Sequence, residues 1–99
     1  MATFISLLHF TDQGIRNVRE TTKRARAFQE AAAKMGIKVR DLFWTLGKYD
    51  LVSIVDAPDA ETAEAFLLAS GSLGNVRSQT MQAFSVDQME KILAKTPKV

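Results

Sequence analysis

The stretch KVRDLFWTLGKYDLVSIVDA, residues 38–57, decides the fold because two β-rich runs flank a glycine within it. Both runs are rich in valine, leucine and aromatic side chains, which suit a half-buried strand. Gly47 and Lys48 fit a two-residue hairpin turn, since glycine at the first central position gives the twist that the flanking strands need. The stretch therefore predicts an antiparallel hairpin in which Leu46 lies opposite Tyr49.

The segment before the hairpin predicts a strand followed by one long helix. Residues 2–10 are rich in Phe, Ile and Leu and end at Thr11 and Asp12, whose side-chain oxygens can cap the first amides of a helix. Apolar and small residues then recur at steps of three and four, which places them on one side of a helix. The predicted stripe consists of Ile15, Val18, Thr22, Ala25, Phe28, Ala32 and Met35. Gly36 is expected to end this helix.

The segment after the hairpin predicts a second helix, a fourth strand and a short last helix. Pro58 and the acidic residues after it suit a helix N-terminus, and Gly71 is expected to close that helix. Residues 75–84 have strand character. Ser85 and Gln88 have the spacing of a capping box, so we expect a short helix that packs at an edge. The element order predicts an α+β ferredoxin-like sandwich with a four-stranded antiparallel sheet and a short C-terminal helix.

The composition indicates a single soluble domain over residues 1–99, with a frayed tail from about residue 95. A net charge of +2, with 24% of the residues charged, does not predict a nucleic-acid or membrane partner. Cysteine is absent, which excludes a thiol nucleophile or a thiolate metal site and fits a cytoplasmic location. The apolar start lacks the flanks of a secretory signal and is too short to span a membrane.

Both faces of the predicted strands carry large apolar side chains. One face of the hairpin is expected to hold Leu42, Trp44, Leu46, Tyr49, Leu51 and Val55, and the other Phe43, Val52 and Ile54. The first strand is expected to repeat this pattern, with Phe4 and Leu8 opposed to Ile5, Leu7 and His9. Exposure of four or five such side chains would cost roughly 1.5–3 kcal/mol each, which is comparable with the stability of a small domain. We therefore predict a homodimer, or a higher homo-oligomer, in which two sheets stack.

Four polar residues are candidates for contact with a ligand. His9, the only histidine, lies at a strand end, and Tyr49 with Asp50 offers a phenol beside a carboxylate. Arg77 on the fourth strand could contact an anion. Each also has a structural interpretation: His9 as a packing residue, Tyr49 and Asp50 as hairpin contacts, and Arg77 as half of an ion pair between subunits.

Metal and nucleic-acid sites are not predicted. No His-x-x-x-His or Asp-x-Asp spacing occurs, so neither a metal nor a cofactor is expected. The basic stripe of the first helix is interrupted by Glu20 and Glu30, as in an ordinary solvated helix face. The strands also lack the basic residues that flank aromatic side chains on an RNA-reading sheet, so we expect no nucleic-acid partner.

Three blocks in the same order carry a family resemblance: FTDQGI (10–15), TLGKYDLVSIVDAPD (45–59) and GSLGNVRSQTMQAF (71–84). On these blocks the chain resembles the GYD domain proteins, small bacterial and archaeal proteins without an assigned activity. The resemblance implies the ferredoxin-like fold and a dimeric α+β barrel, but no reaction. It also implies a set of motif residues: Gly47, Tyr49 and Asp50, for which the family is named, and Thr11, Gly14, Arg77 and Thr80 in its other blocks.

Three functions remain open at this point. The first is a homodimeric module that binds a small organic molecule between sheet and helices, with His9, Tyr49, Asp50 and Arg77 as polar contacts. The second is a cofactor-independent enzyme, isomerase or monooxygenase-like, with His9 or Asp50 as the proton carrier. The third is a structural or assembly protein without a ligand. An enclosed polar cavity favours the first two, and a filled interface favours the third.

Overall fold

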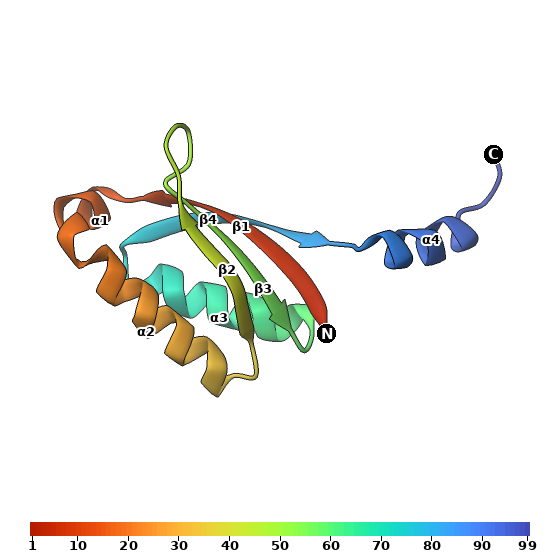
Figure 1. The fold of residues 1–99 in the computed structure, drawn as a ribbon, viewed down its shortest axis with the longest axis horizontal. Helices are drawn as coiled ribbons and strands as arrows, with labels where there is room; N and C mark the ends of the chain where they lie inside the picture. The colour runs from red at the N-terminus through yellow and green to blue at the C-terminus, as the bar shows by residue number, and fades with distance from the viewer.

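A computed structural model describes residues 1–99 and shows a four-stranded antiparallel sheet with two helices packed on one face (Figure 1). The elements in chain order are β1 (Ala2–Phe10), α1 (Asp12–Arg16), the 3₁₀ turn η1 (Val18–Glu20), α2 (Thr21–Lys34), β2 (Lys38–Trp44), β3 (Leu51–Ala57), α3 (Ala60–Ser72), β4 (Val76–Ala83) and α4 (Val86–Lys95). The strand order is β2-β3-β1-β4, so β2 and β4 form the two edges. The predicted ferredoxin-like α+β fold is confirmed.

Strands β1 and β3 separate their residues between two faces as predicted. Alternate residues of β3 are buried against the helices: Leu51, Ser53, Val55 and Ala57. In β1 the buried set is Phe4, Ser6 and Leu8. Ile5 pairs with Ile54 on the other face, which no helix covers.

The hydrophobic core lies between α2, α3 and the inner face of the sheet. Its buried members are Phe4, Ala32, Ile37, Val55, Ala57, Ala63 and Phe66. Phe28 of α2 and Phe66 of α3 bring the two helices together, with ring centroids 4.8 Å apart. Ala32 and Ala63 are small enough to let each helix lie close to the sheet.

The prediction of a single long helix before the hairpin is wrong. The helix is interrupted at Asn17, and the segment forms α1, η1 and α2. The guanidinium of Arg24 donates to the main-chain oxygens of Gly14 at 3.3 Å and Asn17 at 2.9 Å. These bonds satisfy carbonyls that an unbroken helix would have paired internally. Ile15 and Val18 are consequently 52% and 38% exposed instead of facing the core.

The two-residue hairpin turn is also wrong. The β2–β3 ladder ends at the pair Trp44–Leu51, and the Thr45 amide donates to the Asp50 oxygen at 2.8 Å, which closes a longer loop over residues 46–49. Gly47 lies in this loop with φ of 122°, a conformation that favours glycine.

Helix α3 begins where predicted and ends later than predicted. The Asp59 carboxylate accepts a hydrogen bond from the Thr62 amide at 2.7 Å and caps the helix. Gly71 lies inside the helix, which runs to Ser72. The left-handed residue that follows is Gly74, with φ of 85°.

The cap at Asp59 predicts an acid-dependent stability difference. The backbone N–H of Thr62 lowers the pKa of Asp59, so its ionised form is favoured in the folded protein. A lowered folded pKa gives stability above the unfolded pKa, and this is lost as pH falls through the folded pKa. We expect Asp59→Ala to differ most from the wild type in urea unfolding above about pH 5, and the difference to shrink below about pH 3.9. Glu30→Ala is the control, and a difference for Asp59→Ala that stays constant with pH would contradict this role.

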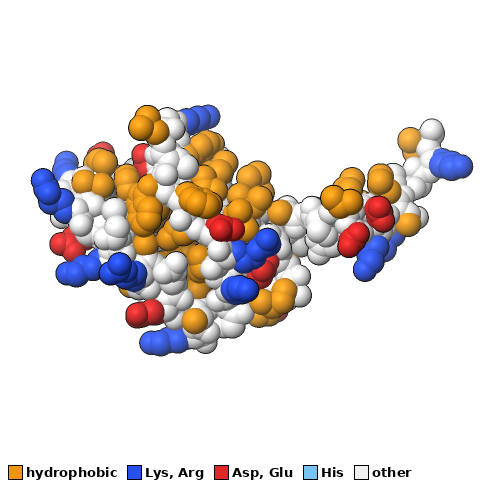
Figure 2. Space-filling model, in the orientation of Figure 1, with side chains coloured by type: hydrophobic (Ala, Val, Ile, Leu, Met, Phe, Trp, Pro, Cys, Tyr) orange, Lys and Arg blue, Asp and Glu red, His pale blue; other side chains and the backbone are white.

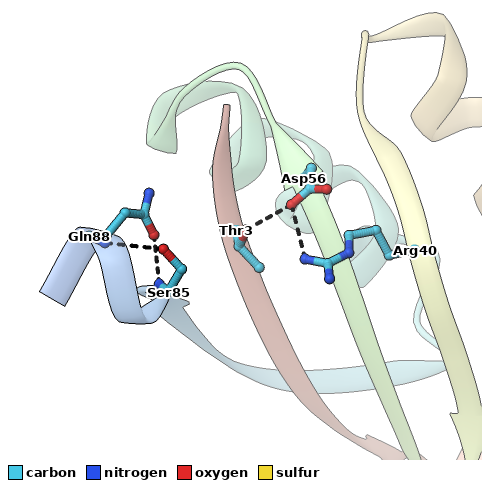
Figure 3. A network of polar contacts seen from close by, with 5 residues as sticks. All are labelled: Thr3, Arg40, Asp56, Ser85 and Gln88. Atoms are coloured by element: carbon cyan, nitrogen blue, oxygen red, sulfur yellow. Dashed lines mark hydrogen bonds and ion pairs between the residues drawn. The ribbon is translucent and has the colours of Figure 1, made fainter.

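A β-bulge and a polar network mark the β2 edge of the sheet. The register shifts between Val39 and Asp41, at the bulge. The Asp56 carboxylate of β3 accepts a hydrogen bond from the Thr3 hydroxyl of β1 at 2.7 Å and lies 3.6 Å from the Arg40 guanidinium of β2 (Figure 3). Strand β4, at the other edge, pairs with β1 without a bulge.

Helix α4 forms as predicted, but it does not pack at an edge. The capping box is present: the Gln88 amide donates to the Ser85 hydroxyl at 3.1 Å and the Ser85 amide to the Gln88 side chain at 2.8 Å (Figure 3). Extended backbone at Ser85, with φ of −70° and ψ of 171°, carries the chain onward from β4. The helix therefore projects away from the sheet and helices (Figure 1). None of the helices has both the length and the apolar character needed to cross a membrane.

Candidate functional site

The sheet face opposite the helices, here called the open face, has an apolar centre. By register it carries Ile5, Leu7, Phe43, Val52, Ile54 and Met81. Phe43 is 56% exposed and Met81 49% exposed. In Figure 2 hydrophobic side chains gather over the strands and again along α4. A contiguous apolar surface of this kind indicates an interaction site.

One end of the open face carries a group of polar and aromatic side chains, here called the tyrosine cluster: His9, Tyr49, Arg77 and Gln79. The rings of His9 and Tyr49 are tilted, with centroids 4.7 Å apart, and the Tyr49 hydroxyl donates to Gln79 Oε1 at 3.0 Å. Arg77 lies opposite His9 in the ladder and so shares its face. The Lys48 ammonium lies 5.6 Å from the centre of the Tyr49 ring. The structure thus brings together three of the four predicted ligand contacts.

Asp50, the fourth predicted contact, is bonded to the backbone of β1. Its Oδ2 accepts a hydrogen bond from the Phe10 amide at 2.8 Å, and its own amide donates to the Leu8 oxygen at 2.8 Å. The chain after Gly47 is therefore held by β1, beyond the end of the β2–β3 ladder. This is why Tyr49 reaches the open face. The two-residue turn had instead predicted that Tyr49 shares a face with Leu51.

Replacing Asp50 is expected to destabilise the fold. Asp50→Ala leaves the Phe10 amide without its charged acceptor, which should cost about 1.5–3 kcal/mol. Asp50→Asn keeps a side-chain oxygen and should lose less. Urea unfolding measures both, with the exposed Asp41→Ala expected to stay within about 0.5 kcal/mol of the wild type. A similarly small effect of Asp50→Ala would show that this hydrogen bond does not hold the loop.

Thr11 and Gly14 join α1 to the loop before β4. The Thr11 hydroxyl accepts a hydrogen bond from the Gly14 amide at 3.0 Å and donates to the Gly74 oxygen, while the Thr11 amide donates to the Asn75 oxygen at 3.1 Å. Gly14 lies so close to this loop that a Cβ would be 2.0 Å from the Asn75 oxygen. These two motif residues therefore have a structural role.

Thr80 and Gly47 lie in different surroundings from the tyrosine cluster. The Thr80 hydroxyl is hydrogen-bonded to the buried Ser6 hydroxyl at 2.7 Å, between β4 and β1 on the helix side of the sheet. Gly47 lies in the exposed hairpin loop. The motif is thus divided between residues that hold the fold and residues on the open face.

The space between α2 and the sheet is too small for the predicted ligand. A cavity of about 70 Å³ lies between α2 and the sheet, with apolar lining from Leu8, Phe28, Leu42 and Leu51. Typical small-molecule sites are about 300–1,000 Å³. A larger hollow, about 480 Å³ and open to solvent, lies between α3 and β4. Groups of three His, Asp or Glu side chains close enough to hold a metal ion are not found.

The chain is similar in sequence to one family of small domains and to a curated relative. The family model described as GYD domain matches residues 4–93. The glutamine synthetase and cystathionine beta-lyase binding protein of Thermus thermophilus is 34% identical over 87 residues, which cover 87% of this chain and 92% of the relative.

Solved structures show the same fold. The crystal structure of TTHA0845 from Thermus thermophilus superposes with a TM-score of 0.57 at 27% identity, covering 87% of this chain and 96% of that chain. FFRP-DM1 superposes with a TM-score of 0.59 at 20% identity, covering 85% of this chain and all of that one, and this likeness concerns the fold alone.

Proposed function

Since the chain belongs to the GYD domain family, we propose that it is a homodimeric binding module with a ligand site at the edge of its own dimer interface. The open face is the self-association surface, and the tyrosine cluster is the ligand site. One observation carries the proposal: the apolar centre of the open face runs directly into the tyrosine cluster, from Leu7 to its neighbours His9 and Gln79.

The dimer is supported by the composition of the open face. Its centre is apolar, and its ends carry the Arg40–Asp56 pair and the tyrosine cluster. An apolar centre inside a polar rim is the usual anatomy of a protein interface. Two sheets stacked about 10 Å apart would cover both centres with one contact. A second copy provides such a sheet, and a two-fold axis makes one surface serve both partners.

The tyrosine cluster is suited to a small organic anion. Arg77 and Lys48 supply positive charge, His9 and Tyr49 an aromatic surface, and Gln79 an amide. The acidic residue next to Tyr49 in the chain, Asp50, is bonded to the Phe10 amide. Guanidinium groups bind carboxylates with paired hydrogen bonds, so we infer an aromatic or aliphatic carboxylate as the ligand class.

Benzoate, with the neutral benzamide as its matched probe, tests the ligand site. We expect saturable quenching of protein fluorescence by benzoate, and about tenfold weaker binding in Arg77→Gln, equal to roughly 1.4 kcal/mol. Arg26→Gln on α2 is the control and should bind like the wild type. Equal binding of benzamide would exclude recognition of the anion. Conversion of an added carboxylate, abolished in His9→Ala, would support the enzyme alternative instead.

A second candidate function comes from the relative, which is named for binding glutamine synthetase and cystathionine beta-lyase. At 34% identity over most of both chains, binding of one of these enzymes is a direct proposal for this chain. The test is sedimentation of purified glutamine synthetase and cystathionine beta-lyase, both from the organism that encodes this chain, with and without the chain. Comigration with one enzyme and not with an unrelated enzyme of similar mass supports it, and separate boundaries at micromolar concentrations exclude it.

A further inference from the structure

Helix α4 presents an apolar stripe that nothing in its own chain covers. The stripe consists of Val86, Met89, Ile92 and Leu93, spaced to lie on one side of the helix. Val86 is 78% exposed and Leu93 59% exposed. The hydrogen bonds of α4 stay within residues 85–96, and neither salt bridge of the protein involves this helix.

The sequence nevertheless specifies this helix. The reciprocal Ser85–Gln88 capping box satisfies two amides at its start, and Asp87 is placed favourably in its first turn. A helix of this length is marginal alone in water, so the stripe needs a surface to pack against. The GYD family match extends to residue 93 and so includes most of α4. The helix thus lies within the domain that the family shares.

The groove between α3 and β4 is an uncovered surface on the body of the chain. It has a volume of about 480 Å³, and Leu67, Leu68 and Val76 give it an apolar part within a lining that is otherwise mostly polar. Leu68 is 67% exposed. A side chain added at Gly71 would meet no atom within 4 Å, so the floor of the groove is open at this point. The outer edge of β4 has no neighbouring strand.

We propose that α4 of one copy packs into the α3–β4 groove of a second copy, so that the homodimer is closed by two exchanged arms. The proposal rests on the homodimer proposed above. Helix α4 leaves the end of β4, the strand that places Met81 on the open face, so a second copy on that face lies beside the root of the arm. The extended backbone at Ser85 directs the arm away from its own groove.

Charge also matches between arm and groove. The groove carries the acidic Glu64 on α3, and the arm carries the basic Lys95 next to Ile92 at the edge of its apolar stripe. An acid on the groove can therefore pair with a base on the arm. Because both surfaces belong to the same chain, one two-fold axis creates both contacts. Once the sheets hold two copies together, each arm is at a high effective concentration near the groove of the other copy. A weak arm contact then adds measurably to the stability of the dimer.

The absence of cysteine permits a direct test by cross-linking. Met89→Cys protein is mixed with Leu68→Cys protein and treated with a short bis-maleimide reagent. We expect a mixed covalent dimer that forms at least tenfold faster than when Leu68→Cys is replaced by Ala31→Cys on α2. Equal rates for the two partners would overturn the proposal. In a chain that carries both Met89→Cys and Leu68→Cys, cross-linking within a single chain instead of between chains would also overturn it.

Removal of residues 85–99 separates this proposal from the proposed homodimer. We expect the truncated chain to remain dimeric at high concentration, with a dissociation constant at least tenfold higher than that of the full chain. An unchanged dissociation constant would exclude the arm while leaving the sheet-stacked dimer intact. A truncated chain that is monomeric, together with a full-length Ile54→Asp variant that stays dimeric, would instead overturn the sheet-stacked dimer.

Discussion

Gly14→Ala should be the most damaging small substitution in this chain, with a loss of about 3 kcal/mol or more of unfolding free energy. The added Cβ would lie 2.0 Å from the main-chain oxygen of Asn75, so a backbone segment has to move. Movement there disturbs the Thr11 amide, which donates to the same oxygen at 3.1 Å. Urea or thermal unfolding measures the loss, and a circular dichroism spectrum at low temperature shows whether the variant still folds.

Gly71→Ala is the matched control for Gly14→Ala. Gly71 also lies in a helix, but a Cβ there meets no atom within 4 Å. Alanine is the better helix former, so this variant should gain roughly 0.5–1 kcal/mol. Opposite signs for the same chemical change would assign the Gly14 effect to its contact with Asn75. A Gly14→Ala variant as stable as the wild type would show that α1 does not need this close approach.

Ile54→Asp should separate the two copies of the proposed dimer. Ile54 lies in the central strand β3, opposite Ile5, in the middle of the open face. A second sheet would bury the introduced carboxylate without a partner, so the dissociation constant should rise by at least about 100-fold, or roughly 2.7 kcal/mol. Sedimentation velocity across the micromolar range measures this change.

Two further variants keep the test of the open face decisive. Ile15→Asp places the same charge on an apolar residue of α1 that is 52% exposed, and it should leave the dimer unchanged. Phe43→Asp lies on the open face but is 56% exposed in the single chain, so it should weaken the dimer while leaving the monomer folded. A wild-type protein that sediments as a monomer at these concentrations would end the dimer proposal.

The sequence predicts the fold well where a pattern is local and repeated. The alternation in β1 and β3 correctly separates Phe4 and Val55 from Ile5 and Ile54. The capping box at Ser85 and the helix end at Gly36 are also found, since each depends on a few adjacent residues. The resemblance to the GYD domain proteins is recognisable in the sequence itself, and the family match over residues 4–93 confirms it.

The errors arise where contacts between distant segments override a local pattern. The long helix is broken because Gly14 packs on the loop at Asn75 and Arg24 caps the freed carbonyls. The hairpin loop is longer than two residues, and Asp50 at its end bonds to the Phe10 amide, 40 residues earlier in the chain. These partners are far apart in sequence, and periodicity carries no information about them.

The candidate site can be predicted only in part, for the same reason. His9 and Arg77 face each other through the β1–β4 register, and Tyr49 joins them from the loop that Asp50 holds against β1. Gln79 alternates with Arg77 along β4, but its bond to the Tyr49 hydroxyl depends on that loop. A signal for this arrangement is the Tyr49-Asp50 pair after the turn glycine: Tyr49 contacts His9 on the open face, and Asp50 bonds to the backbone of β1.

The bulge at Arg40 limits how far sheets of this protein can extend. Fibrils grow when strands can be added at both edges of a sheet, because each added molecule then exposes another unpaired edge strand. The margin formed by β2 is distorted between Val39 and Asp41 and is flanked by the charges of Lys38 and Arg40, whereas the β4 margin is regular. Strand addition at the β4 margin therefore stops after one step. The bulge at Arg40 therefore prevents continued addition of molecules through their edge strands.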